Sequence, residues 1–126
     1  MEASNAKQKI LDALKDIEFH DLPVEKFSFK TEMSTAFIVD IALNNEAIND
    51  YEYWSISFED IVTLKCGPLE LNESSDAEIT RFAYSWDELF IGKMEFLMGF
   101  GETYLAVEFS CKNVTIQPIP NPNEDR

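Results

Sequence analysis

The chain contains few of the residues from which most catalytic and metal sites are built. Its 126 residues include one histidine, two cysteines and four glycines. A single histidine excludes metal sites with two or more imidazole ligands, and it leaves His20 as the only imidazole base for a serine or cysteine nucleophile. His20 follows a predicted helix, where histidine more often interacts with the helix dipole and carbonyl groups. We therefore expect no histidine-dependent catalysis.

The cysteines and glycines form no recognisable chemical motif. Cys111 lies on the apolar face of a predicted strand, and Cys66 has only Lys65 beside it, whereas reactive thiols need a positive environment. Both thiols are expected to be inert, with a disulfide between them as the alternative. Gly99-Phe100-Gly101 is shorter than a nucleotide-binding glycine loop and predicts a turn. No twelve-residue calcium loop is present. We expect no cofactor, no metal ion and no enzymatic activity.

Long apolar runs are also missing. No stretch approaches the roughly 18 apolar residues that a membrane-spanning helix requires. Met1 leads into a polar, amphipathic segment rather than into the apolar core of a secretory signal. The sequence thus predicts a cytoplasmic protein with reduced thiols.

Positive charge is scarce and unevenly distributed. The formal net charge is −14, and residues 1–30 account for only −1 of it. No lysine or arginine occurs between Lys30 and Lys65, where seven acidic residues lie. Such a surface repels phosphate groups, so nucleic-acid and membrane binding are not expected. It favours association with a basic protein. The alternative is that the acidity only keeps the chain soluble.

The length fits one domain, predicted at residues 1–118, followed by a disordered tail at 119–126 that is rich in proline, asparagine and charge. Apolar residues at helical spacing predict a helix at Ser4–Ile17. Alternating apolar residues, the signature of half-buried strands, predict the remaining elements. These strands are Val24–Thr31, Thr35–Leu43, Tyr51–Cys66 with a bulge or bend at Glu59-Asp60, Met94–Met98, Thr103–Cys111 and Val114–Gln117.

Two local features complete the predicted fold. Residues 76–91 match both a helix with a capping box and a strand, and the aromatic residue types favour a strand at Glu78–Tyr84. Lys112-Asn113 predicts a turn, and Pro118 predicts the end of strand pairing. Together the elements predict an α+β fold, in which an N-terminal helix packs on a curved antiparallel sheet of about five to seven strands. The sheet is expected to form a half-barrel or a two-layer sandwich.

Composition and charge favour a non-enzymatic, acidic protein-binding module. A bacterial immunity protein that neutralises a basic toxin has this size and charge, although no sequence motif identifies that family. The acidic and aromatic residues predicted to bind the partner are Asp50, Tyr51, Glu52, Tyr53, Glu59 and Asp60. Three alternatives remain at this point. The first is a self-assembling subunit such as a homodimer, and the second is a hydrolase or isomerase of unrecognised type. The third is a carrier of an apolar ligand, with a cavity lined by Trp54, Phe96, Met98 and Phe109.

Overall fold

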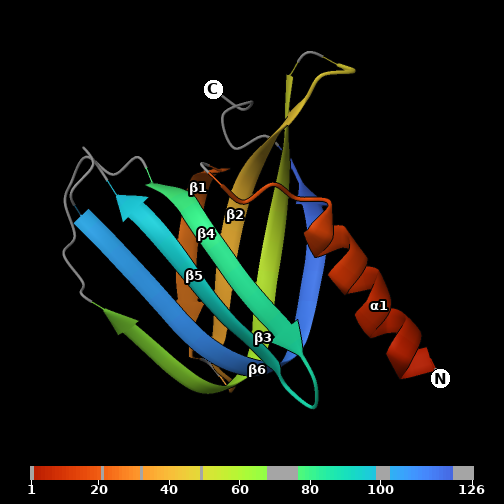
Figure 1. Ribbon diagram of the computed structural model, residues 1–126, viewed down its shortest axis with the longest axis vertical. Coiled ribbons are helices and arrows are strands. Elements are labelled where there is room, and N and C mark those ends of the chain that lie inside the picture. Colours follow the sequence, from red (N-terminus) through yellow and green to blue (C-terminus); the bar gives the residue numbers. More distant parts are fainter. Residues whose placement is uncertain are drawn as a thin grey trace.

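The computed structural model describes residues 2–20, 22–31, 33–48, 50–67, 77–98 and 103–120. Within these residues one helix precedes six antiparallel strands that close into a barrel (Figure 1). The elements are α1 (Glu2–Lys15), β1 (Leu22–Lys30), β2 (Ala36–Asn45), β3 (Asp50–Gly67), β4 (Ala77–Trp86), β5 (Phe90–Met98) and β6 (Thr103–Ile119). The predicted α+β class, the N-terminal helix and the antiparallel sheet are confirmed, and β4 contains the predicted strand Glu78–Tyr84.

Around the barrel the strands follow the order β1-β2-β3-β6-β5-β4. The curvature exceeds that of the predicted half-barrel because β1 pairs on both sides. It pairs with β2 at Val24 and from Lys26 to Lys30, and from Leu22 to Val24 it also pairs with the first residues of β4. Glu25 is an extra residue in the pairing with β2, between Val24 and Lys26, and such a bulge bends a strand. The bend directs the start of β1 toward β4 and closes the sheet.

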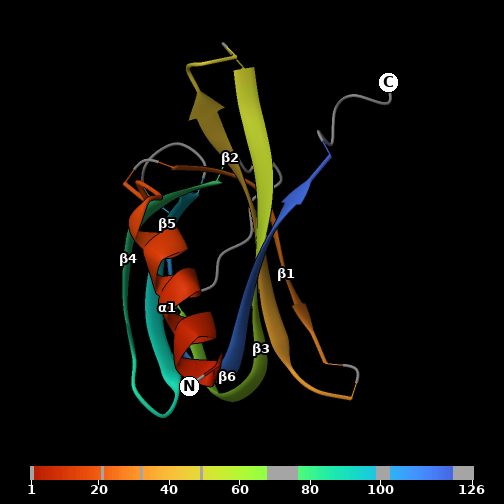
Figure 2. The ribbon, with the colours of Figure 1, turned by 90° about the vertical axis from the view of Figure 1, so that its right-hand side faces the viewer.

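Strands β3 and β6 run side by side along most of their length, which differs from the prediction for β6 (Figure 2). The predicted turn at Lys112-Asn113 is wrong, because Asn113 pairs with Glu59 inside one continuous strand. Pairing also continues past Pro118, which lies opposite Trp54. Proline is tolerated there because β5 no longer flanks this part of β6, so the missing amide proton breaks no second ladder.

The bulge predicted near Glu59-Asp60 is confirmed. Asp60 has a positive φ of 55°, and Val62 is an extra residue where the pairing with β6 shifts. Two predicted features lie outside the described residues, namely the turn at Gly99-Phe100-Gly101 and residues 121–126 of the tail. The described chain reaches Pro120, and β6 extends to Ile119.

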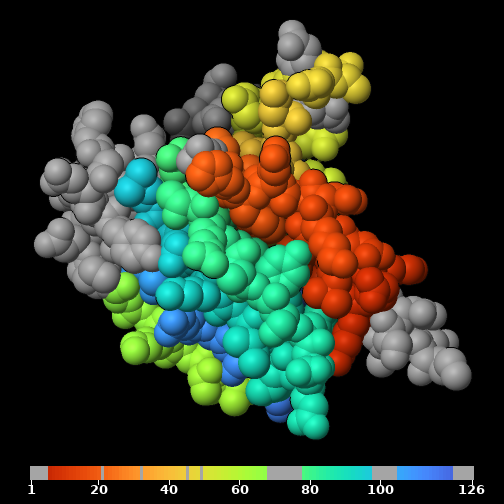
Figure 3. Space-filling model, viewed as in Figure 1, coloured from red at the N-terminus to blue at the C-terminus, as the bar shows by residue number. Residues whose placement is uncertain are grey.

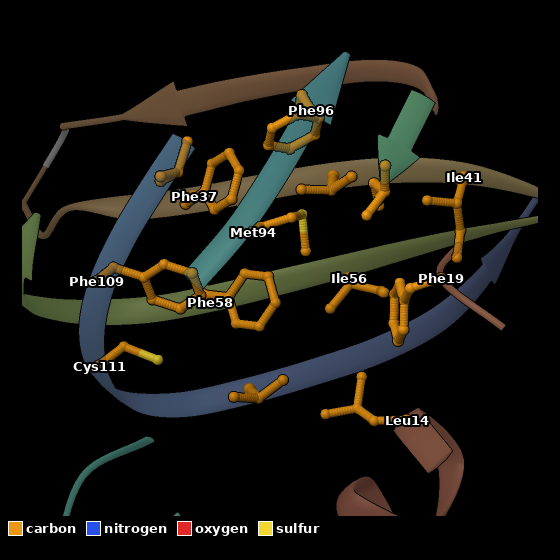
Figure 4. Close-up of a cluster of buried hydrophobic side chains, with 14 of the residues drawn as sticks. Leu14, Phe19, Phe37, Ile41, Ile56, Phe58, Met94, Phe96, Phe109 and Cys111 are labelled. Atoms are coloured by element: carbon orange, nitrogen blue, oxygen red, sulfur yellow. The ribbon is translucent and has the colours of Figure 1, made fainter. Parts of the chain in front are cut away.

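Aromatic rings fill the interior of the barrel (Figure 4). Phe58 lies at the centre, with its ring centroid 4.6 Å from that of Phe109, 5.5 Å from Phe90 and 5.8 Å from Phe37. Helix α1 joins this core through Leu14, which is fully buried. Phe19, just after the helix, makes an edge contact of 5.0 Å with Phe82. Burial of these rings supplies the main favourable term for folding.

Gly92 on β5 makes room for two of these rings. A Cβ atom at Gly92 would lie 2.7 Å from Cζ of Phe109 and 3.0 Å from Cε1 of Phe82. By contrast, a Cβ atom at Gly67, at the end of β3, would meet no atom within 4 Å. The two glycines therefore form a matched pair for testing how tightly the interior is packed.

We predict that Gly92→Ala lowers the free energy of unfolding by about 1–3 kcal/mol, because the added methyl group must displace a buried ring. The control Gly67→Ala is expected to change it by less than about 0.5 kcal/mol. Urea denaturation followed by tryptophan fluorescence measures both. Equal stability of the two variants would show that the rings yield without cost.

Candidate functional site

The end of the β2–β3 hairpin projects from the barrel as a two-stranded arm, which we define as residues 42–48 and 50–53 (Figures 1 and 2). Ala42 pairs with Tyr53 at its base, and Asn45 pairs with Asp50 near its tip. Pairing of β1 with β2 ends at Ile41, and pairing of β6 with β3 ends at Tyr53. Beyond the pair formed by Ala42 and Tyr53, none of the described strands therefore flanks the arm on either side.

The arm exposes apolar groups among carboxylates. Ile48 in the turn is 59% exposed, and Tyr51 on β3 is 50% exposed. Glu46, Asp50 and Glu52 surround them in the sequence, and the arm contains no lysine or arginine. Exposed aromatic and aliphatic side chains within a charged rim are typical of protein interfaces. The arm therefore has the chemistry to bind a protein partner of opposite charge.

A surface cleft with a volume of about 780 Å³ separates the arm from the segment that follows α1. In Figure 3 the arm stands directly above that segment. Four carboxylate residues line the cleft, namely Asp16 and Glu18 from the helix exit and Glu46 and Glu52 from the arm. The lining also includes His20, Leu22, Pro23 and Tyr51, together with residues 42–44 of β2.

His20 forms part of the wall of this cleft. Its Nδ1 atom lies 3.2 Å from the carbonyl oxygen of Thr80 on β4. This contact ties the segment after α1 to the barrel, which agrees with the structural role expected for His20. The carbonyl group belongs to a distant strand, however, and not to the end of the helix.

Tyr53 lies at the base of the arm in a negative environment. Loss of solvent around its hydroxyl group, followed by the charges of Glu25 and Asp50 and the neighbouring Tyr51, raises the pKa of Tyr53 above its usual value. Each of these effects disfavours the charged phenolate. The hydroxyl group therefore stays protonated well above neutral pH and remains able to donate a hydrogen bond.

The structure divides the six predicted partner-binding residues into two groups. Asp50, Tyr51, Glu52 and Tyr53 lie together on the arm. Glu59 follows six residues later on the same strand, which corresponds to roughly 20 Å of extended chain. Asp60 beside it accepts a hydrogen bond of 2.9 Å from Nδ2 of Asn113, next to the β3 bulge. Glu59 and Asp60 thus lie at the bulge and do not extend the arm surface.

The sequence alone did not predict three of the four carboxylate residues that line the cleft. Asp16, Glu18 and Glu46 were not among the predicted residues, although all three line the cleft with Glu52. About thirty residues separate the helix exit from the arm in the sequence, and no periodicity links the two segments. The uneven charge distribution was the only available signal, and it covered Glu46 but not the helix exit.

Other kinds of site have little support among the described residues. No three histidine, cysteine or acidic side chains lie close enough there to hold a metal ion. Within the same residues, no helix is long and apolar enough to span a membrane. No family model, curated protein or solved structure matches the chain, so its function must be inferred from its own residues.

The two thiols are free and differ in accessibility, so the alternative of a disulfide between them is wrong in this structure. Cys66 is exposed near the end of β3, whereas Cys111 is buried in the barrel. Burial, partly offset by a hydrogen bond to the backbone of Asn113, raises the pKa of Cys111 to about 12. Cys111 is therefore a neutral core residue at physiological pH, as its place on the apolar strand face predicted.

We predict that the native protein reacts with one equivalent of 5,5′-dithiobis(2-nitrobenzoic acid) at neutral pH, because only the Cys66 thiol is accessible. Addition of 6 M guanidinium chloride, a concentration that unfolds most domains of this size, should release the second equivalent. The control variant Cys66→Ser should show no fast reaction in the native state. Fast labelling of both thiols in the native protein would contradict the burial of Cys111.

Proposed function

We propose that this protein is a non-enzymatic binding module whose acidic arm and adjoining cleft bind a basic protein. The observation that carries the proposal is the exposure of Ile48 and Tyr51 at the end of a projecting hairpin, among carboxylates and without any basic residue. Solubility alone would account for the acidity. It does not account for apolar side chains placed at the most prominent point of the arm.

The charges and the apolar groups have different roles in this proposal. The net charge of −14 attracts a cationic partner over distances of about one Debye length and speeds the encounter. Tyr51 and Ile48 then become buried against the partner and slow its release. A cationic nuclease toxin is one partner with the required chemistry, and its neutralisation by this chain would make the protein an immunity protein.

The interior packing does not favour the ligand-carrier alternative. Phe96 stacks on Phe27 with a centroid distance of 5.1 Å, and Phe109 contacts Phe37 at 5.7 Å. Rings that were considered as the lining of an apolar cavity therefore contact other core side chains. The exposed apolar side chains of Ile48 and Tyr51, by contrast, lie on the arm and not in the core.

We predict that Glu46→Lys weakens binding of a basic partner by about tenfold at low salt, because it reverses one charge at the tip of the arm. The partner is first captured from lysate of the cells that make the protein, then purified and titrated by isothermal calorimetry. The difference between the variant and the wild type should shrink at about 0.5 M salt, where the Debye length is only a few ångströms.

Glu88→Lys is the matched control for this experiment. Glu88 is an exposed glutamate in the turn between β4 and β5, and that turn lies at the opposite end of the barrel from the arm (Figure 1). The two variants have the same net charge, so only the position of the substitution differs. If both lose the same affinity, binding follows total charge and the arm has no special role.

A second candidate function is self-association, and one observation favours it. From Thr63 to Gly67, after the bulge residue Val62, β3 pairs with β6 on one side and with no described strand on the other. Val62 is 52% exposed just before this stretch, and Leu64 is also exposed. An exposed strand edge with apolar side chains is a site where two copies of a chain can pair.

Self-association at this edge predicts a concentration-dependent dimer in sedimentation-velocity experiments, and Val62→Lys should shift it to monomer. Ile48→Lys is the control, because it places the same charge on a similarly exposed residue of the arm. The two variants also separate the two functions, since Ile48→Lys should weaken binding of a basic partner and Val62→Lys should not. A monomeric wild type at all concentrations would eliminate self-association.

A further inference from the structure

One wall of the cleft is an edge of β2 that no longer pairs with β1. After pairing with Ile41, β1 continues toward β4 and leaves residues 42–45 of β2 without a neighbour among the described strands. The bulge at Glu25 redirects the chain, and Pro23 has no amide proton to offer to β2. Residues 42–44 line the cleft, so this edge faces it.

An unpaired edge that faces a cleft can bind an extended peptide. Backbone amide and carbonyl groups along such an edge accept an additional strand, and the surrounding side chains select its sequence. The four residues of the edge span roughly 13 Å. The opposite wall, formed by Asp16, Glu18, His20, Leu22 and Pro23, lies far enough away to leave a cleft of about 780 Å³.

The side chains of the cleft specify the charge of that peptide. Asp16 and Glu18 stand on one wall, and Glu46 and Glu52 stand on the arm. Side chains of an added strand would point alternately to its two faces, toward solvent-accessible carboxylates. These carboxylates attract lysine and arginine side chains, whereas acidic side chains would be repelled. Charge complementarity therefore favours a basic segment.

We propose that the cleft binds an extended, lysine- or arginine-containing segment of the partner, which adds as a strand to the edge of β2 at residues 42–45. This inference rests on the proposed function, because it specifies how the basic partner is bound. Strand addition supplies affinity through backbone hydrogen bonds, and the carboxylates of the cleft supply selectivity for basic side chains. Tyr51, which also lines the cleft, contributes its exposed ring.

Two peptides of equal charge test strand addition. The first alternates lysine and threonine over about eight residues, the length of an ordinary strand, and the second has the same sequence with every backbone amide nitrogen methylated. The two peptides carry the same side chains and the same charge, but only the first has amide protons to donate to the edge of β2. We expect the lysine–threonine peptide to bind at least about tenfold more tightly, since two or three hydrogen bonds are at stake.

Amide hydrogen exchange locates the bound peptide. The amide protons in residues 42–45 that β3 does not already bind should exchange more slowly when the lysine–threonine peptide is present. The methylated peptide should leave them unchanged. Slowed exchange at Val62–Gly67 instead would place the added strand on the other free edge and overturn the assignment to the cleft.

Charge reversal at the cleft provides an independent test. Glu18→Lys combined with Glu46→Lys should weaken binding of the lysine–threonine peptide by about tenfold or more, because the charge of one residue on each wall is reversed. Asp87→Lys combined with Glu88→Lys is the control with the same net charge. These two residues lie in the turn at the far end of the barrel, and the control should retain wild-type affinity.

The outcomes separate this inference from the proposed function. If both peptides bind equally tightly and Glu46→Lys still weakens binding of the purified partner, the arm binds a basic protein but the proposal of strand addition is wrong. If neither peptide binds and no basic partner responds to Glu46→Lys, the proposed function fails as well. Selective binding of the lysine–threonine peptide, with slowed exchange at residues 42–45, supports both.

Discussion

The pairing of Leu22–Val24 with Ala77–Ile79 closes the barrel, and most other features depend on it. The bulge at Glu25 bends β1, which pairs with β2 on one side and, at Leu22–Val24, with β4 on the other. Closure encloses the phenylalanine cluster and removes two sheet edges. The same redirection leaves the end of the β2–β3 hairpin without a neighbour, so the stable interior and the exposed arm have a common structural origin.

The interior and the surface of the protein therefore have distinct roles. Rings such as Phe37, Phe58 and Phe109 contact one another inside the barrel, and Gly92 is small because the rings occupy its space. The residues that we propose to bind a partner lie outside the barrel, where acidic residues line the cleft beside the arm. A rigid barrel is well suited to this arrangement, because a site on a stable scaffold loses less conformational freedom on binding.

Sequence patterns predicted the strands well and their ends less well. Alternation identified the strand at Glu78–Tyr84 against a competing helical pattern, and the charged pair Glu59-Asp60 marked a real bulge. The prediction failed at Lys112-Asn113 and at Pro118, where local turn and breaker residues suggested interruptions. There β3 supplies a continuous partner, and the pairing it offers outweighs the weak local preferences of these residues.

The sequence by itself determined the α+β class of the fold, the acidity of the chain and its scarcity of histidine and cysteine. These properties depend on composition and on spacings of two or four residues, which can be read locally. Only the tertiary structure decided that the sheet closes, that Asp50–Tyr53 stand apart from Glu59 and Asp60, and that Asp16 and Glu18 face the arm across a cleft. The physical reason is that strand pairing joins residues distant in the chain, and period-two patterns show which face is buried without showing which strand lies alongside.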